Sequence, residues 1–464
     1  MKIAQIKNDL INWRELTPKK ILKYLSFVVG SIILIFLLAF IFSPDPFINS
    51  LLKDRITKSL AETYPEHSIK FGDLHYSVWN NRMGCDSIKL KSKDSTVSFS
   101  VGSITVGGIS WIKILWKRDF ALSDLSSSTI DARKILFNSQ KSQEGISIEI
   151  LHISVPDSEI VSDSVKYFSL LSDEQLFANS RFRQTRFQFD IPKIKIIGLD
   201  YPGLFDGKIY NARSISIDNI FADILVNMDQ PSEKGSVNPQ MPNETLSELN
   251  EIVKIDSIKI INGRLKYSER FAIGKTPGVI TFKNVNVSAF GITNNKVDPD
   301  TTIIVADGIF MNFAKMKLHM KIPLASKDFS LEYSGLLSAM DATELNSFIE
   351  ASEHQRIKSG VIQSAAFNIN VNSGQASGSL RVIYNDLSIV MINKETGSDM
   401  GVFNRMVSLF GKIFVIRENN KPDEKGLIEI GEIKYTRSPD NHFIQYLWLA
   451  LRNGIAVVVG FPPT

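Results

Sequence analysis

The stretch Phe367-Asn-Ile-Asn-Val-Asn372 alternates apolar and polar side chains without exception. Successive side chains of a β-strand point to opposite faces, so this pattern predicts a strand with one buried face and one wet face. The same period of two recurs in residues 68–76, 96–101 and 209–217. The chain is therefore predicted to be mainly β from residue 67 onward.

Turn residues interrupt these segments at short intervals, for example at Asp307-Gly308 and Gly374-Gln375. Short turns join antiparallel neighbours, whereas parallel neighbours need long crossover segments. The sequence therefore predicts an extended antiparallel meander with few helices. The expected helices lie at residues 164–181, 341–353, 402–414 and from His442 onward.

A long sheet with one apolar face must bury that face. Because few helices are available to cover it, we expect the sheet to curl on itself into an elongated, taco-like β-groove. Two ordinary sandwiches with side-chain-filled cores, separated near residues 226–250, explain the same alternation.

Residues 229–250 carry three prolines and no apolar period, which predicts a loop or linker. This segment would divide an N-terminal β-segment, residues 67–228, from a C-terminal β-segment, residues 251–440.

The N-terminus supplies the net charge of the whole chain. The 464 residues carry a net charge of +4, and residues 24–464 are balanced. A nucleic-acid-binding protein carries its basic excess on the folded domain, so nucleic acid is not expected as a partner. Residues 1–20 are instead expected to form a basic cytoplasmic tail. The charged residues up to position 23 are Lys2, Lys7, Arg14, Lys19, Lys20 and Lys23 against Asp9 and Glu15.

Residues 24–42 read YLSFVVGSIILIFLLAFIF and contain no charge. At about 1.5 Å per residue, such a helix nearly spans the ~30 Å hydrocarbon layer of a bilayer. We therefore predict a transmembrane anchor at residues 21–43. A cleaved signal peptide is the alternative, but the Phe-Ser-Pro-Asp at the end of the segment does not fit its cleavage site.

The basic residues before the anchor predict a cytoplasmic N-terminus and place the folded bulk across the membrane. After the anchor, residues 44–66 show apolar side chains at helical spacing. This amphipathic helix either caps the following domain or lies on the membrane surface.

The residue types that carry catalysis or bind metals show no functional spacing. No two of the 6 histidines lie three or four residues apart, and neither a nucleophile elbow nor a dinucleotide-binding glycine turn occurs. The lone Cys85 excludes an intramolecular disulfide and is expected to be a small buried side chain. We therefore expect no enzymatic activity, no cofactor and no metal ion.

Two regions of the chain resemble the AsmA-like family of bacterial envelope proteins. The first, within residues 69–133, contains FGDLHYSVWNNRMGCDSIKLKSKD and VGSITVGGISWIKILWKRDFALSDLSSSTIDA. The second, within residues 331–462, contains LEYSGLLSAMDATELNSFIE and HFIQYLWLALRNGI. The order of basic tail, anchor, helix and strands is also similar to that family.

The resemblance implies a β-groove, open along one seam, that moves phospholipid between the inner and outer membranes of a Gram-negative envelope, as bridge-like lipid transfer proteins do. It implies an inner-membrane protein with its bulk in the periplasm and without catalytic residues. A shuttle, an oligomer and a bridge completed by a partner all stay open. The alternative function is a non-enzymatic scaffold for envelope assembly or outer-membrane protein biogenesis, with side-chain-filled β-cores.

Eight apolar side chains alternate as one lining face of such a groove would require, and each fits a plain core equally well. A buried methylene contributes about 0.8 kcal/mol, so acyl chains need an apolar lining rather than a specific pocket. The candidate lipid-contacting residues are Ile69, Phe71, Ile258, Ile260, Ile280, Phe282, Ile303 and Val305.

The C-terminal residues 441–464 form an apolar segment that contains a single charge, Arg452. An apolar helix is predicted at Phe443–Leu451, because Gly454 weakens a helix beyond that point. We expect this segment to close the groove or to contact the outer membrane or an envelope protein. A second membrane span is disfavoured by the charge of Arg452.

Overall fold

The computed structural model describes residues 31, 34–35, 43–53, 57–58, 65–109, 126–178, 180–205, 208–231, 239–272, 275–297, 301–393, 396–402, 406–407, 413–414 and 416–460. Within these ranges, no helix has both the length and the apolar character needed to cross a membrane. The predicted tail lies outside the described residues, and so does almost all of the predicted anchor at 21–43.

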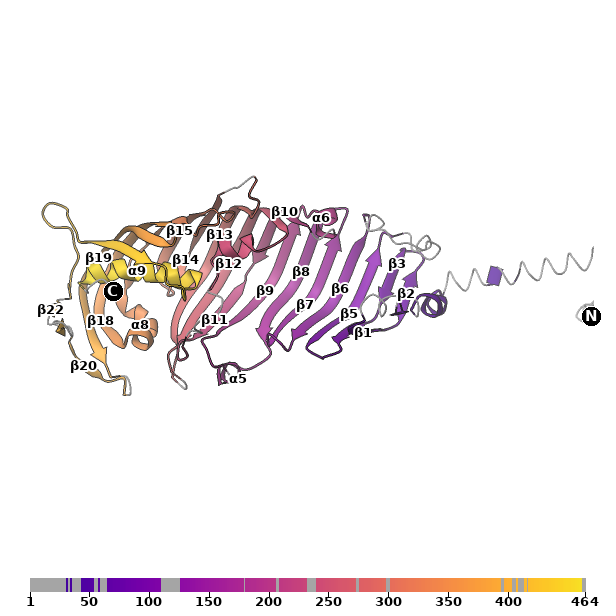
Figure 1. The fold of residues 1–464 in the computed structure, drawn as a ribbon, viewed down its shortest axis with the longest axis horizontal. Coiled ribbons are helices and arrows are strands. Elements are labelled where there is room, and N and C mark those ends of the chain that lie inside the picture. Colours follow the sequence, from indigo (N-terminus) through magenta and orange to yellow (C-terminus); the bar gives the residue numbers. More distant parts are fainter. Residues whose placement is uncertain are drawn as a thin grey trace, which may run out of the picture.

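One large mixed sheet organises the described part of the chain, which confirms the mainly β prediction (Figure 1). Its first half contains β1 (His67–Phe71), β2 (Leu74–Ser77), β3 (Arg82–Cys85), β4 (Ile88–Ser92), β5 (Val97–Gly107), β6 (Thr129–Ser139), β7 (Glu144–Ser154), β8 (Glu159–Ser169), β9 (Thr185–Ile197), β10 (Ile209–Asp218) and β11 (Phe221–Asn227).

The second half of the sheet contains β12 (Ile252–Arg270), β13 (Gly278–Thr293), β14 (Thr302–Phe310), β15 (Ala314–Ile322), β16 (Leu331–Leu337), β17 (Met340–Asp341), β18 (Gln355–Asn372), β19 (Gln375–Ile392), β20 (Asp399–Val402) and β23 (Ile430–Thr436). A separate pair is formed by β21 (Met406–Val407) and β22 (Ile413–Phe414).

Helical elements are short and few among the described residues. They are α2 (Asp45–Ile48), η2 (Asn49–Lys53), α5 (Asp173–Ala178), α6 (Tyr201–Phe205), α7 (Pro242–Ser247), η4 (Ala342–Leu345), α8 (Asn346–Glu353) and α9 (Phe443–Val459). The predicted helix at 341–353 is thus confirmed as η4 and α8.

The other two internal helix predictions are wrong. Residues 164–181 hold the second half of β8 and then the short α5, while residues 402–414 hold, where described, the end of β20 and the strands β21 and β22. In β8, Ser164 has a left-handed backbone with φ of 53°. This residue interrupts the alternation of apolar and polar side chains, so the sequence pattern does not reveal the strand.

The sheet is not antiparallel throughout, because β12 runs parallel to both β10 and β11. The chain must therefore return from the end of β11 to the start of β12 through a crossover. The predicted linker at 229–250 is this crossover. Strands on both sides of it belong to one sheet, so the division into two sandwiches at this point is wrong.

The crossover is held against the sheet in its described part. Met241, which precedes α7, is fully buried in a cluster with residues of β13 and β15. Arg437 Nη1 donates to Glu244 Oε1 at 2.6 Å, which ties α7 to the end of β23. A helix of 6 residues whose buried residue is the polar Asn243 is too short to show a recognisable helical period.

α9 lies across the C-terminal end of the sheet (Figure 1). It extends past the predicted end at Leu451 to Val459. Gly454 does not end the helix. The absence of side chains on Gly454 and on Gly431 of β23 lets α9 approach this strand: a Cβ on Gly431 would lie 2.2 Å from the Gly454 carbonyl oxygen. The charge of Arg452 is paired with Glu353 of α8 at 2.9 Å.

At the opposite end of the sheet, α2 packs on β2 and β3. Ile48 is 2% exposed and belongs to a cluster with Leu74 and Met83. Asn49 Nδ2 donates to the Leu74 carbonyl oxygen at 2.8 Å, and the Leu74 amide donates to Asn49 Oδ1 at 2.9 Å. In its described part, the helix predicted at 44–66 therefore caps the sheet.

His75 joins α2 to the sheet. It should make the free energy of unfolding of the protein depend on pH. Its Nδ1 lies 2.8 Å from Asp45 Oδ2 of α2, and its Nε2 lies 2.9 Å from Asp86 Oδ2. Hydrogen bonds to Asp86 and then Asp45 raise the pKa of His75 to about 8. The protonated imidazole therefore stabilises the folded state fully below the unfolded pKa of about 6.5, and this contribution is lost as pH rises through about 8.

Because His75 is half exposed, solvent screening should limit the effect to about 1 kcal/mol or less. Thermal unfolding of the full chain on either side of this pH range measures it. His75→Gln should remove most of the pH dependence, and a variant that keeps the original dependence would contradict the assignment.

The glycine contact between β23 and α9 gives a second prediction. Gly431→Ala should lower the free energy of unfolding by about 1–3 kcal/mol, because the new methyl group overlaps the backbone of α9. Gly84→Ala is the matched control in another strand, since its Cβ would meet no atom closer than 3.8 Å. Urea unfolding gives the free energies, and equal values for the two variants would argue against the close packing of α9.

Candidate functional site

Strand register arranges apolar side chains in continuous rows that cross the sheet. Cross-strand partners point to the same face, so each row can be followed from strand to strand. Row A crosses the sheet from β2 to β23 and contains no charged residue. Its members are Tyr76, Met83, Val106, Ile130, Ile153, Ile160, Ile196, Ile215, Ile258, Ala289, Ile304, Met320, Tyr333, Ile369, Gly378 and Ile433.

Row B lies two residues along each strand from row A and therefore on the same face. Its one polar member is the hydroxyl of Ser162. The row comprises Leu74, Cys85, Ile104, Ala132, Leu151, Ser162, Ile194, Ile217, Ile260, Val287, Ala306, Leu318, Gly335, Phe367, Leu380 and Gly431.

The side chains between rows A and B point to the other face and carry the charges. Lys195 Nζ lies 2.8 Å from Glu159 Oε2 on this face, and His152 Nδ1 lies 2.7 Å from Asp131 Oδ1. Where rows A and B run, the sheet thus has one apolar face and one face that carries the charges.

Two further apolar rows cross the strands nearer their other ends. Row C joins Phe71, Ile88, Val101, Ile135, Ile148, Val165 and Ile191. Row D joins Ile69, Leu90, Phe99, Phe137, Ile146, Tyr167, Phe189, Ala222, Leu265, Phe282 and Phe310.

Row D is rich in aromatic side chains that touch across strands. The ring centroids of Tyr167 and Phe189 lie 5.7 Å apart, and those of Phe282 and Phe310 lie 5.2 Å apart. These distances are typical of favourable aromatic pairs. Row D therefore forms a continuous apolar strip rather than a set of isolated side chains.

The rows are covered at the C-terminal end of the sheet. Tyr333 is 2% exposed, and Ile369 and Ile433 are fully buried, in a cluster with Tyr446 and Ala450 of α9. At the N-terminal end, α2 covers the row members of β2 and β3. Both ends of the apolar face are therefore filled with the chain's own side chains.

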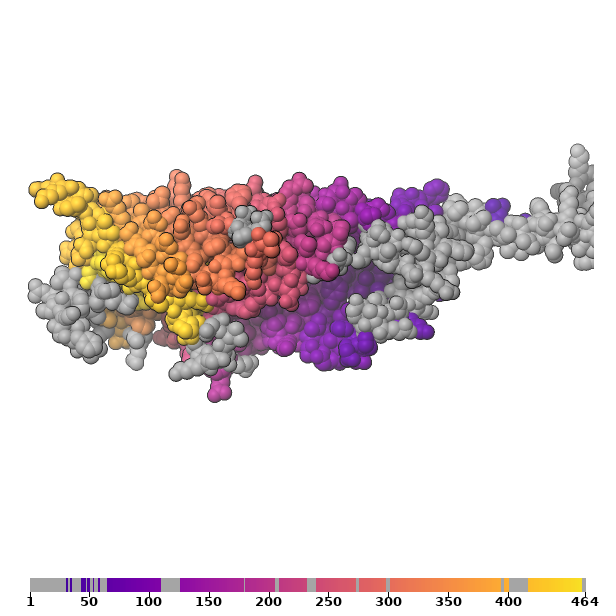
Figure 2. All heavy atoms as spheres, turned by 45° about the horizontal axis from the view of Figure 1, so that its top comes forward, coloured from indigo at the N-terminus to yellow at the C-terminus, as the bar shows by residue number. Residues whose placement is uncertain are grey.

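Between these covers, row A is not packed into a core. The row A isoleucines of β6–β10 are only half-buried. Among the described residues, no member of β6–β11 belongs to a cluster of buried apolar side chains. Figure 2 shows a hollow along this purple-to-magenta part of the molecule. We refer to the part of rows A–D on β6–β11 as the uncovered stretch.

A buried carboxyl lies where the covered part begins. Glu269 of β12 is 8% exposed and accepts a hydrogen bond from the Tyr267 hydroxyl at 2.6 Å. Burial is the main cause that raises the pKa of Glu269. Its cross-strand partner Gly278 faces α8, because a Cβ there would lie 3.1 Å from the Phe348 carbonyl oxygen. This carboxyl thus sits on the apolar face beside α8, in the covered part.

The register brings most of the predicted lining residues onto this face, but not into the uncovered stretch. Ile258 and Ile260 lie in rows A and B on β12, and Phe282 lies in row D on β13. Ile69 and Phe71 lie in rows D and C on β1.

Ile280 also lies on this face, two residues from Phe282 along β13, and packs in a cluster with Met311 and Met340. The last two predicted lining residues lie on the other face. Ile303 and Val305 are 39% and 47% exposed, and they pair with Lys321 and His319 on the charged face. Placing Ile303 and Val305 in the same lining as Ile258 is therefore wrong.

Sequence reasoning missed the residues that form the uncovered stretch. These are mainly the row A isoleucines Ile130, Ile153, Ile160, Ile196 and Ile215. The alternation of isoleucines in residues 146–153 is a signal that could have found one of them. No sequence pattern separates a row that a helix covers from a row that stays uncovered.

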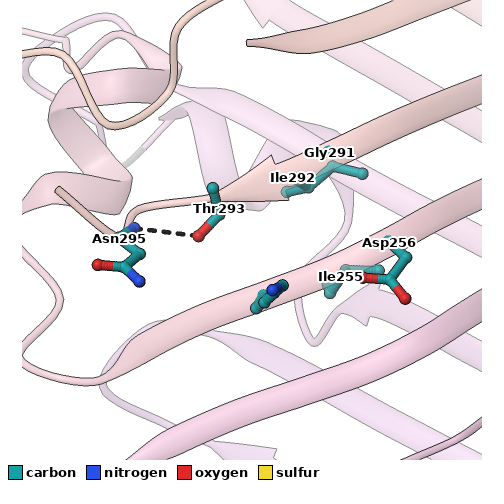
Figure 3. A pocket seen from close by; sticks show the side chains of 7 residues that line it. Ile255, Asp256, Gly291, Ile292, Thr293 and Asn295 are labelled. Atoms are coloured by element: carbon teal, nitrogen blue, oxygen red, sulfur yellow. Dashed lines mark hydrogen bonds between the residues drawn. The ribbon is translucent and has the colours of Figure 1, made fainter. Parts of the chain in front are cut away.

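Enclosed cavities and metal sites offer no competing site in the described ranges. A cavity of about 20 Å³, which holds about one water molecule, lies between β12 and β13 (Figure 3). Asn295 donates its backbone N–H to Thr293 Oγ1 at 3.0 Å beside it. No group of three metal-ligating side chains occurs in the part of the chain that the structure describes.

Comparison of the chain with models of known protein families finds no match, and comparison with curated proteins finds none either.

The contrast between covered and uncovered parts of row A can be measured. Ile369→Asn should lower the free energy of unfolding by about 3–5 kcal/mol, because it leaves a cavity and a buried amide without partners. Ile160→Asn in the uncovered stretch should cost only about 1 kcal/mol. Urea unfolding compares the two variants, and equal losses would mean that packed side chains also cover β8.

Proposed function

We propose that this protein binds phospholipid acyl chains in a β-groove formed by the uncovered stretch and helps to move lipid between the inner and outer membranes. The observation that carries the proposal is the change of environment along row A. Its isoleucines on β6–β10 are half-buried, whereas its members on β15–β23 are buried under α9.

The size of the apolar face supports a lipid as the occupant. Soluble proteins rarely expose a contiguous apolar patch larger than a few hundred Å², and larger patches mark binding sites. Four uncharged rows cross strands β6–β9, and each buried methylene of a bound tail contributes about 0.8 kcal/mol. A lining that is uncharged over several strands suits long acyl chains better than a small polar ligand.

The proposed location follows from the sequence before residue 44. In this proposal, residues 21–43 anchor the chain in the bacterial inner membrane with the N-terminus in the cytoplasm, and the sheet lies in the periplasm. α9 uses one face to cover its own sheet and leaves Ile444 and Trp448 exposed on the other, at 60% and 37%. These two side chains are available for contact with a membrane or an envelope protein.

The covered part of the sheet favours the second candidate, a non-enzymatic scaffold for envelope assembly. The clusters beneath α9 form a side-chain-filled core of the kind such a scaffold would have. In a scaffold, the uncovered stretch would receive a protein segment instead of lipid.

Photo-crosslinking distinguishes the two candidates. A photo-crosslinking amino acid in place of Ile153, in row A, should capture phospholipid when the full chain is irradiated in cells. Ile150 is the matched control, because it lies on the same strand but points to the charged face with Asp163 and Arg133. Capture of a protein instead of lipid at position 153 would support the scaffold. Equal lipid capture at both positions would contradict a specific groove.

A further inference from the structure

We infer that the groove is closed at both ends, so that a lipid enters and leaves it sideways over the strand ends and not along its length. This inference rests on the proposed function. It specifies the route of the lipid and the amount that one chain can hold.

The N-terminal closure is built by α2. Ile48 packs on Leu74 of row B and on Tyr76 and Met83 of row A, and partly buried Ile104 of β5 contacts the same cluster. Asp45 Oδ1 also accepts the Tyr76 backbone N–H at 2.9 Å. The positions that a lipid tail would need to pass this end are therefore occupied by the chain itself.

The C-terminal closure is built by α9 and the crossover. Tyr446 and Ala450 are fully buried on the row members of the last strands, and the Tyr333 hydroxyl donates to the Leu447 carbonyl oxygen at 3.2 Å. Met241 of the crossover fills the same cluster from the other side. The glycine contact between Gly431 and Gly454 leaves no space for an acyl chain between α9 and β23.

The distance between the two closures limits the load. Along row A, the uncovered stretch comprises the positions of β6, β7, β8, β9 and β10, which at ~4.8 Å per strand measure about 24 Å. Acyl tails extend about 15 Å, half of the ~30 Å hydrocarbon layer of a bilayer. The groove therefore has room for the tails of about one or two phospholipids, not for a continuous file of them.

A photoactivatable lipid tests this inference on the unmodified full chain. Phosphatidylethanolamine with a diazirine in one acyl chain is incorporated into vesicles together with the protein, and the labelled peptides are mapped by mass spectrometry. Labels should lie on the strands of residues 129–227, and row members within residues 314–392 should carry none. Native mass spectrometry should find at most about two lipids per chain.

The outcomes separate this inference from the proposed function. Labels on the apolar face of both regions, or more than about two lipids per chain, would overturn the closed ends and leave lipid binding intact. Labels in neither region would overturn lipid binding and the inference with it.

A variant of the cover gives a second test. Gly454→Val should push α9 away from β23, because a Cβ there would already lie 2.8 Å from Ile433 Cγ1. Hydrogen exchange of the α9 amides reports whether the helix has detached. Labelling should then extend to residues 314–392. Labelling that stays on residues 129–227 although α9 is detached would overturn the role of α9 as the closure.

Discussion

Left-handed residues in the middle of β6, β8, β12 and β13 determine which side chains of these strands share the apolar face. Lys134 in β6 and Ser164 in β8 both have φ of 53°, and both lie opposite Glu149 of β7. Asn262 in β12 and Asn284 in β13 continue the feature with φ of 54° and 49°. The left-handed backbone is unfavourable at these positions, because it costs a non-glycine residue about 1–2 kcal/mol.

The left-handed residue changes the face to which the side chains after it point. Ala132 and Ile135 of β6 are an odd number of residues apart, so a regular strand would point them to opposite faces. The left-handed residue between them turns the chain over and lets rows A and B share a face with rows C and D. In β18 a β-bulge between Ile362 and Ser364 has the same outcome: Ile362 and Phe367 are an odd number of residues apart, yet both belong to clusters that contain α9 residues.

This change of face also explains what the sequence could and could not predict. Regular segments such as residues 68–76 and 367–372 were predicted correctly as strands, because their alternation is local. The 164–181 segment was misread as a helix because Ser164 shifts its phase. Three consecutive apolar residues, Ile303 to Val305, could not be assigned to a face from sequence, because the register with β13 and β15 decides it. The length of α9 depended on the contact of Gly454 with a strand far away in the chain.

The rows themselves are similar in both halves of the sheet, and the covers make the difference. Row A has the same apolar character at Ile196 as at Ile369, but only the second lies under α9. The segments that return over the sheet therefore divide its apolar face into a packed core and the uncovered stretch. A prediction from the strands alone would not distinguish the covered part of this face from the uncovered stretch.

The position of α9 after all the strands of the sheet has a consequence for biosynthesis. Strands β5–β9 pair with their immediate neighbours in the chain, so each hairpin can form as soon as both of its strands have been synthesised. The row members of β15–β19 are completed by a helix made last, and until then Met320, Tyr333 and Ile369 lack the side chains of Tyr446 and Ala450 that cover them. The nascent protein thus passes through a state with a far longer exposed apolar face than the finished one. In that state the chain is more prone to aggregation than the finished protein.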